Sequence, residues 1–327
     1  MRTPRIKTLA KTLKIMLIII LIIGILADII GSFYLYEIGI ARNSKEFLAE
    51  TEDVQASVEI MMSTQSEEID YEWFYQQEFE QVQITSYDGL VLNGYFLEAE
   101  TPTNKTAILV HGYSSWAEGM GVYAKFYYEN LGYNILMPDA RGHGSSEGDY
   151  IGLGWHDRKD YVKWIDYVIE RKGTSSEIVL HGVSMGGAAV LMTSGEELPD
   201  NVKAIISDSA YTSAKDELAY MLTRLYHLPS FPLLQSTSLL TKIRAGFFFG
   251  EASALKQVKK ANKPILFIHG GNDTIVPVEM VYKLYENCGS EKELFVVAGA
   301  AHGTAYNVDP EGYERQITEF LNKYVGK

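Results

Sequence analysis

The chain has very little cysteine: Cys288 is the single one in 327 residues. One cysteine excludes an internal disulfide, and no cysteine and histidine spacing typical of a zinc site is present. We therefore expect no metal and no organic cofactor. A lone cysteine is compatible with either side of a cell membrane, so it does not indicate a compartment.

Basic residues are also scarce, with 29 Lys and Arg against 42 Asp and Glu and a net charge of -13. Five of the basic residues and no acidic one lie in residues 1–14, which leaves 24 basic against 42 acidic residues in the remainder. A body this acidic repels phosphates, so nucleic acid is excluded as an expected partner. Internal repeats and low-complexity tracts are absent. The 46% hydrophobic and 22% charged residues are typical of a globular protein.

A long apolar run follows the basic N-terminus. It is uninterrupted from Ile15 to Ala27 and resumes beyond Asp28 as far as Tyr36. Residues 15–36 are long enough to cross a hydrocarbon layer of ~30 Å as a helix. With residues 1–14 in the cytoplasm by the positive-inside rule, everything after Tyr36 lies outside. We expect a single-pass anchor in the cell membrane, with the lipid bilayer as a partner and the rest of the chain extracytoplasmic.

The alternative for this segment is a signal peptide cleaved near Ala27. Ile25 and Ala27 make a poor small-x-small cleavage site, so the uncleaved anchor is favoured. Asp28 is either a functional intramembrane carboxylate or a residue that marks the interface, and its place beyond the uninterrupted run favours the interface.

Residues 37–77 are polar and acidic with spaced apolar positions, which predicts a helical stalk or N-terminal extension. The aromatic cluster at 71–75 is either a binding surface or a contact with the core, and we favour the contact. Residues 78–327 form the main domain. Residues 211–260 lie between two expected strands of this domain and carry apolar positions at helical spacing.

Within this domain, apolar strand-like segments alternate with helical ones after an initial hairpin. This alternation predicts an α/β fold, a mostly parallel sheet covered by helices on both faces. The expected strands are residues 79–85, 90–97, 106–110, 133–137, 177–180, 202–207, 264–268 and 293–297, and the expected helices are 116–131, 157–171, 277–287 and 310–324.

A G-x-S-x-G pattern centred on Ser184 lies directly after the strand at 177–180 and opens a helix of small residues. A serine on such a tight turn has strained backbone angles, and it needs glycines two positions away on either side. The amide N–H of Met185 then points toward an incoming carbonyl oxygen from the positive end of the helix. Ser184 is the candidate nucleophile.

A serine nucleophile needs a base that is itself oriented by a third group. Of the seven histidines, His302 lies in a flexible small-residue loop after the last strand, which suits a base that must reach another strand. Asp273 follows a strand and is the preferred orienting acid, with Asp208 as runner-up. The order Ser184, Asp273, His302 is that of the α/β-hydrolases.

The region 78–324 resembles α/β-hydrolases, in particular bacterial membrane-anchored serine hydrolases akin to monoacylglycerol lipases and serine aminopeptidases. The motifs that carry the resemblance are HGYSS at 111–115, DARGHGSSEG at 139–148, HGVSMGG at 181–187, and HGGNDTIVP at 269–277 with AAHG at 300–303. The resemblance implies the triad Ser184, Asp273 and His302. It also implies an oxyanion hole from the backbone N–H groups of Tyr113 and Met185, and a structural brace at 139–145. A cap inserted at residues 211–260 is implied as well, and its apolar positions either cover a substrate or only pack the cap down.

Three functions stay open at this point. The first is hydrolysis of carboxylic or thio esters through an acyl-serine, with a small-molecule acyl ester or lipid as substrate. The second is a serine peptidase or acyl-peptide hydrolase, although no sequence feature identifies an anchor for a peptide terminus. The third is a catalytically silent, surface-tethered binding domain. We rank them in this order because no triad residue is missing.

Overall fold

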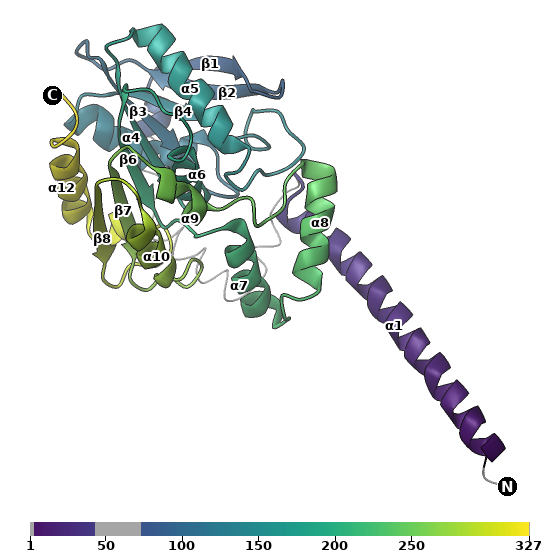
Figure 1. The fold of residues 1–327 in the computed structure, drawn as a ribbon. Coiled ribbons are helices and arrows are strands. Elements are labelled where there is room, and N and C mark those ends of the chain that lie inside the picture. The colour runs from purple at the N-terminus through teal and green to yellow at the C-terminus, as the bar shows by residue number, and fades with distance from the viewer. Residues whose placement is uncertain (1–2, 43–72, 327) are drawn as a thin grey trace.

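The computed structural model describes residues 3–42 and 73–326. Its centre is an eight-stranded sheet in the order β1-β2-β4-β3-β5-β6-β7-β8 (Figure 1). β2 is antiparallel to both β1 and β4, and the other neighbouring strands are parallel. The strands are β1 (Glu80–Thr85), β2 (Val91–Leu97), β3 (Lys105–Val110), β4 (Asn134–Pro138), β5 (Glu177–Val183), β6 (Val202–Asp208), β7 (Ile265–Gly270) and β8 (Lys292–Val297).

Helices cover both faces of this sheet, as Figure 1 shows. The alternation along β3 divides the core in two: Ile108 and Val110 join one apolar cluster, and Ala107 and Leu109 join the other. The helices of the first cluster are α5 (Asp157–Lys172), α6 (Met185–Thr193), α9 (Ala254–Gln257) with η4 (Val258–Lys260), and α10 (Glu279–Asn287); those of the second are η2 (Ala117–Met120), α4 (Gly121–Lys125), η3 (Phe126–Asn130), α11 (Ala305–Val308) and α12 (Pro310–Leu321). The predicted mostly parallel sheet between two helical layers is confirmed.

The N-terminal helix α1 (Thr3–Gly39) is one continuous helix that projects away from the sheet (Figure 1). From Thr8 onward it is long and apolar enough to cross a membrane, judged by length and composition, and its most apolar stretch is not buried against the protein. Its C-terminal part joins the domain. Directly after the helix, Ile40 is buried and its carbonyl oxygen accepts a hydrogen bond of 2.7 Å from the amide of Ile151.

Between β6 and β7 the chain forms α7 (Ala214–Tyr226) and α8 (Leu233–Ala245) before it returns through α9. The hydroxyl of Ser213 caps α7 by accepting a hydrogen bond of 3.1 Å from the amide of Asp216. In Figure 1 α7 and α8 lie side by side at one end of the sheet, and α8 lies against the C-terminal part of α1.

The aromatic cluster predicted to contact the core does so through Trp73 and Phe74, which are both buried. The indole N–H of Trp73 donates to a carboxylate oxygen of Glu129 at 2.7 Å, and the ring of Phe74 stacks on Phe79. These contacts fasten the start of the domain to η3 and β1. The helical stalk predicted before them lies largely at residues 43–72, outside the described residues.

Candidate active site

Ser184 stands on the turn between β5 and α6, with φ 58° and ψ -118°. A residue with a side chain is strained in this left-handed region. The surrounding main chain also leaves no room for a Cβ atom at the neighbouring glycines. A Cβ at Gly186 would lie 2.0 Å from the carbonyl oxygen of Val110, and one at Gly182 would lie 2.2 Å from that of Gly186. The glycines of the motif are therefore required by packing between β5, α6 and β3, and they hold the serine hydroxyl clear of the backbone.

A continuous chain of hydrogen bonds joins the three residues predicted from separate motifs. The Oγ of Ser184 lies 2.8 Å from Nε2 of His302, and Nδ1 of His302 lies 2.7 Å from Oδ2 of Asp273. Both Asp273 and His302 are buried. When Nδ1 carries the proton and donates a hydrogen bond to the Asp273 carboxylate, Nε2 is unprotonated and can accept a hydrogen bond from the serine hydroxyl. This Nδ1–H tautomer is the one that a general base requires.

The loop after β7 holds the carboxylate of Asp273 in place. Its Oδ1 accepts hydrogen bonds from the amides of Ile275 (2.9 Å) and Val276 (2.8 Å), so only Oδ2 remains for His302. Burial acts to raise the pKa of Asp273, but His302 and His269 beside it hold the pKa well below its usual range. The carboxyl of Asp273 is therefore ionised at neutral pH.

The pairing with Asp273 shifts the pKa of His302 in the opposite direction. Burial alone lowers the pKa of His302, and the negative charge of Asp273 outweighs it, so the net pKa lies above the usual value of 6.5. The carboxyls of Glu217 and Asp208 act in the same direction from further away. The site therefore favours the protonated form of the His302 imidazole.

The two predicted oxyanion donors occupy adjoining places. Met185 is the first residue of α6, whose N-terminus carries partial positive charge. Tyr113 follows Gly112 in the loop after β3, and a Cβ placed on Gly112 would lie 3.4 Å from Cβ of Ser184. The loop that carries the amide of Tyr113 therefore passes directly beside the serine.

The runner-up acid, Asp208, has other partners. It lies at the end of β6, where its carboxylate accepts hydrogen bonds from the hydroxyls of Tyr313 and Ser209, both at 2.9 Å. His181 in turn lies 3.1 Å from the Tyr313 hydroxyl. The carboxylate that contacts His302 is that of Asp273, so the geometry favours the preferred acid over the runner-up.

The loop at 139–148 acts as a brace through two buried residues. Asp139 accepts hydrogen bonds from the amides of Ala117 (2.9 Å) and Ser145 (2.8 Å). Arg141 pairs with Asp160 at 2.7 Å and with Asp88 at 2.9 Å, and its side chain is 1% exposed. The hydrogen bonds of this one guanidinium to two carboxylates join the turn between β1 and β2, this loop, and α5.

One residue near the base has no counterpart in the sequence motifs. Glu217, on the first turns of α7, has a buried carboxyl oxygen, Oε2, without a hydrogen-bond partner among the described residues. Burial raises the pKa of Glu217 to about 8, and His302 is the charged group that acts on it most strongly. Its position four residues after the Ser213 cap is an ordinary helical one, so no local pattern could have singled it out.

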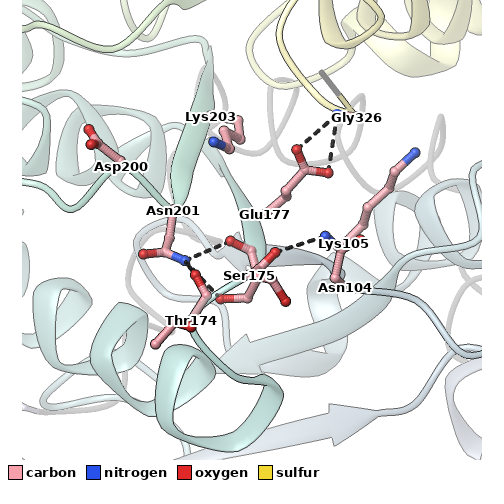
Figure 2. A pocket seen from close by; sticks show the side chains of 10 residues that line it. Asn104, Lys105, Thr174, Ser175, Glu177, Asp200, Asn201, Lys203 and Gly326 are labelled. Carbon is pink, nitrogen blue, oxygen red and sulfur yellow. Dashed lines mark hydrogen bonds between the residues drawn. The ribbon is translucent and has the colours of Figure 1, made fainter.

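A polar hollow, which Figure 2 shows, lies at the opposite edge of the sheet, where β3, β5 and β6 begin. Its groups bind each other: the Asn201 side chain donates to the carbonyl oxygens of Thr174 and Ser176 at 2.8 Å, and Glu177 accepts from the amide of Gly326 at 2.9 Å. Because Ser184 follows the carboxyl end of β5, this hollow is separate from the candidate active site. Its hydrogen bonds tie the end of the chain to the sheet.

In residues 3–42 and 73–326, no group of three His, Cys, Asp or Glu side chains is placed to hold a metal ion.

A model of the prolyl oligopeptidase family matches residues 121–327. The chain belongs to the prolyl oligopeptidase family. This match contains the strand and turn of Ser184 and the loops of Asp273 and His302, whereas Tyr113 lies before it.

Relatives and solved structures agree with this family and with the predicted α/β-hydrolase fold. The Bacillus subtilis protein YqkD is 31% identical over 252 residues, which cover 77% of this chain and 82% of YqkD. A thermostable monoacylglycerol lipase of a Bacillus species is 25% identical over 251 residues, 67% of this chain and 91% of the lipase. The Pyrococcus furiosus esterase Pf2001 superposes with a TM-score of 0.63 at 28% identity, over 79% of this chain and 94% of the esterase. The protein is an α/β-hydrolase of this family.

Proposed function

We propose that the protein is a serine hydrolase that cleaves carboxylic or thio esters through an acyl-Ser184 intermediate. The observation that carries the proposal is the hydrogen-bonded chain from Ser184 Oγ through His302 to Asp273. The similarity to an esterase and a monoacylglycerol lipase supports ester bonds as the substrate class.

In this mechanism Ser184 Oγ attacks the ester carbonyl carbon while its proton passes to His302 Nε2. The amides of Tyr113 and Met185 stabilise the oxyanion that forms. The imidazolium then gives its proton to the leaving alcohol or thiol as the acyl–oxygen or acyl–sulfur bond breaks. Water, deprotonated by the same His302, releases the acid and restores the serine. Asp273 stays ionised throughout and orients the imidazole.

The test is labelling by a fluorophosphonate probe together with turnover of p-nitrophenyl acetate. Ser184→Ala is expected to remain folded and to lose both, with a fall of at least ~10⁴-fold in rate. Ser175→Ala is the matched control, because Ser175 is exposed at the hollow of Figure 2, and it is expected to behave as the unmodified protein. Turnover and labelling that survive in Ser184→Ala would overturn the proposal.

The same assay separates the other two functions. A peptidase would cleave amino-acyl or peptide p-nitroanilides at a substantial rate, whereas an esterase would cleave the matching esters and leave the anilides almost intact. A catalytically silent binding domain would be folded yet unlabelled by fluorophosphonate. We expect labelling, and a preference for esters.

We also propose that α1 anchors the enzyme in the cell membrane as a single pass, with the hydrolase domain outside the cytoplasm. The apolar helix and the basic residues 1–14 support this arrangement. In intact cells, added protease is expected to digest the hydrolase domain, and alkaline carbonate is expected to leave the protein in the membrane pellet. If the hydrolase domain is digested only after the cells are opened, the domain lies in the cytoplasm and the proposed orientation is wrong.

A further inference from the structure

The cap helix α8 is joined to the apolar helix α1 by polar contacts at two levels. The hydroxyl of Ser236 donates to a carboxylate oxygen of Asp28 at 2.5 Å, and Arg244 pairs with Glu37 at 2.7 Å. Close packing accompanies them, since a Cβ on Gly31 would lie 2.9 Å from the side chain of Leu233. Figure 1 shows α8 beside the part of α1 nearest the domain. α8 must therefore lie at the same depth in a membrane as this part of α1.

The length of the apolar helix sets the depth of these contacts. From Lys14, the last basic residue before the apolar run, to Asp28 the helix rises only about 21 Å at 1.5 Å per residue. The hydrocarbon layer is ~30 Å thick, so a spanning helix must continue about six residues beyond Asp28, to near Tyr34. The carboxyl of Asp28 therefore lies inside the layer, on the side of the hydrolase domain.

A carboxyl group in hydrocarbon requires a polar partner, and in this structure Ser236 of α8 is that partner. The first half of α8 must then enter the same layer as Asp28. The end of α8 carries Arg244, whose partner Glu37 lies about 13 Å further along α1 by the same helical rise. The two ion-pairing residues are at the depth of the lipid headgroups, and the apolar contacts lie below them.

The side chains that this arrangement turns toward lipid are apolar and unusually exposed. Outside α1, Ile243 at 74% and Phe231 at 73% have the largest exposed fractions among the large apolar residues that the structure describes. Leu239 at 53% and Leu228 at 44% belong to the same stretch. We call these four side chains the cap edge. Exposure of these side chains to water is unfavourable, whereas in a bilayer the lipid acyl chains solvate them.

We propose that the cap edge is a second membrane-embedded element and that its partner is the lipid of the leaflet on the hydrolase-domain side. The proposal rests on the proposed role of α1 as a membrane-spanning anchor. α8 and the loop before it enter the leaflet without crossing it, in the manner of a monotopic protein.

This placement deepens the proposed function, because α7 connects the cap edge with the catalytic base. On α7 the hydroxyl of Tyr220 donates a hydrogen bond of 2.9 Å to the carbonyl oxygen of Thr274, the residue after Asp273. The helix ends at Tyr226, two residues before Leu228. The helix is about 20 Å long at 1.5 Å per residue. The catalytic residues therefore lie within the length of one short helix of the bilayer surface. The substrate class that this geometry favours is an acyl ester dissolved in the membrane, delivered along the cap.

The test measures depth in the bilayer with the full chain in lipid vesicles. Cys288→Ser removes the native thiol, and single cysteines are introduced by Phe231→Cys, Ile243→Cys, Tyr282→Cys and Ile22→Cys for labelling with a fluorophore. Spin-labelled lipids then quench fluorophores that contact acyl chains. We expect loss of fluorescence at positions 231, 243 and 22. Position 282, on α10, is 43% exposed and is expected to keep its fluorescence.

Each result has a distinct meaning. Quenching at 22 without quenching at 231 and 243 overturns the cap-edge proposal and leaves the anchor intact. No quenching at 22 overturns the anchor itself. Energy transfer between copies labelled at 231, without quenching by lipid, would mean that a second copy covers the cap edge, and it also overturns the proposal.

A kinetic experiment connects the cap edge with catalysis. The double variant Phe231→Asn and Ile243→Asn is expected to lose most of its turnover of a long-chain acylglycerol held in vesicles. Its turnover of the soluble ester p-nitrophenyl acetate is expected to be unchanged, because neither residue belongs to the triad. Equal losses on both substrates would indicate damage to the fold and contradict the proposal. Failure of the unmodified protein on both substrates would contradict the proposed hydrolase function instead.

Discussion

The hydroxyl of Tyr113 donates a hydrogen bond of 3.0 Å to the main-chain carbonyl oxygen of Gly39, the last residue of α1. A second carbonyl, that of Ile38, lies 3.3 Å away. The last carbonyl groups of a helix have no partner within it, and here a side chain from the candidate oxyanion loop supplies one. The end of the proposed anchor and the candidate active site are therefore one packed unit.

This contact predicts the effect of Tyr113→Phe. The variant keeps the ring and the backbone amide, but the loop loses a hydrogen bond of about 1 kcal/mol that holds it against α1. We expect kcat on p-nitrophenyl acetate to fall about five-fold with little change in KM, because the oxyanion donor is less well fixed. Tyr282→Phe, on the exposed side of α10, is the control and is expected to have no effect. An unchanged kcat in Tyr113→Phe would show that the loop does not depend on α1.

The charge of Asp273 predicts a pH profile for the unmodified enzyme. His302 acts as a base only when it is neutral, and its pKa lies above 6.5, so kcat/KM is expected to fall on the acid side with a midpoint above that value. Asp273→Asn removes the charge that outweighs burial, so the pKa of His302 falls and the midpoint moves to lower pH. The rate is expected to fall about 10⁴-fold as well. A midpoint that stays in place would contradict the assignment of Asp273 as the partner of His302.

Much of the fold and the proximity of the three triad candidates could be predicted from the sequence, because the relevant interactions are local or repeated. Apolar runs alternate with helical segments, and parallel strands bring their carboxyl ends to one edge. Ser184, Asp273 and His302 each follow a strand, so one rule of sheet topology brings them together. The catalytic roles of these residues and of Tyr113 and Met185 remain predictions.

Other features depend on contacts between segments distant in the chain, which no local pattern encodes. The side chain of Arg42 donates to the carbonyl oxygens of Gly144 (2.7 Å) and Ser146 (2.6 Å), more than a hundred positions away. The pairing of Asp28 with Ser236 is similar. From the sequence Asp28 was expected to mark an interface, and its partner could not be foreseen, because a serine inside an ordinary helix carries no signal of what it faces.

The buried position of Arg141 predicts a large effect on stability. Burial acts to lower the pKa of Arg141, but its pairs with Asp160 and Asp88 outweigh burial and keep the guanidinium charged. Arg141→Met leaves both carboxylates without their cation, which is expected to cost about 3–5 kcal/mol. Arg171→Met is a matched control, since Arg171 also contacts two carboxylates, those of Glu80 and Glu98, but at the surface. It is expected to cost under about 1 kcal/mol.

The comparison is made by thermal unfolding of the full chain in lipid nanodiscs, followed by tryptophan fluorescence. For a domain of this size, 1 kcal/mol corresponds to about 2–4 °C in Tm. Arg141→Met is thus expected to unfold several degrees below Arg171→Met. Equal Tm values would mean that the brace at 139–148 does not contribute to stability through its ion pairs.

The unpaired carboxyl of Glu217 predicts a stability that depends on pH. Its pKa is about 8 in the folded protein, against an ordinary value of 4.5, so the folded state binds the proton more tightly than the unfolded state. The contribution of this proton to stability is complete below pH 4.5 and is lost as the pH rises to about 8.

Glu217→Gln keeps the shape of the side chain and does not titrate. Relative to the unmodified protein, the variant is therefore expected to gain stability steadily between pH 5 and pH 8, by at most about 1.4 kcal/mol per pH unit. Tm values measured at pH 5 and pH 8.5 for both proteins give the result. A constant difference between Glu217→Gln and the unmodified protein would show that the carboxyl is charged and solvated in the native state.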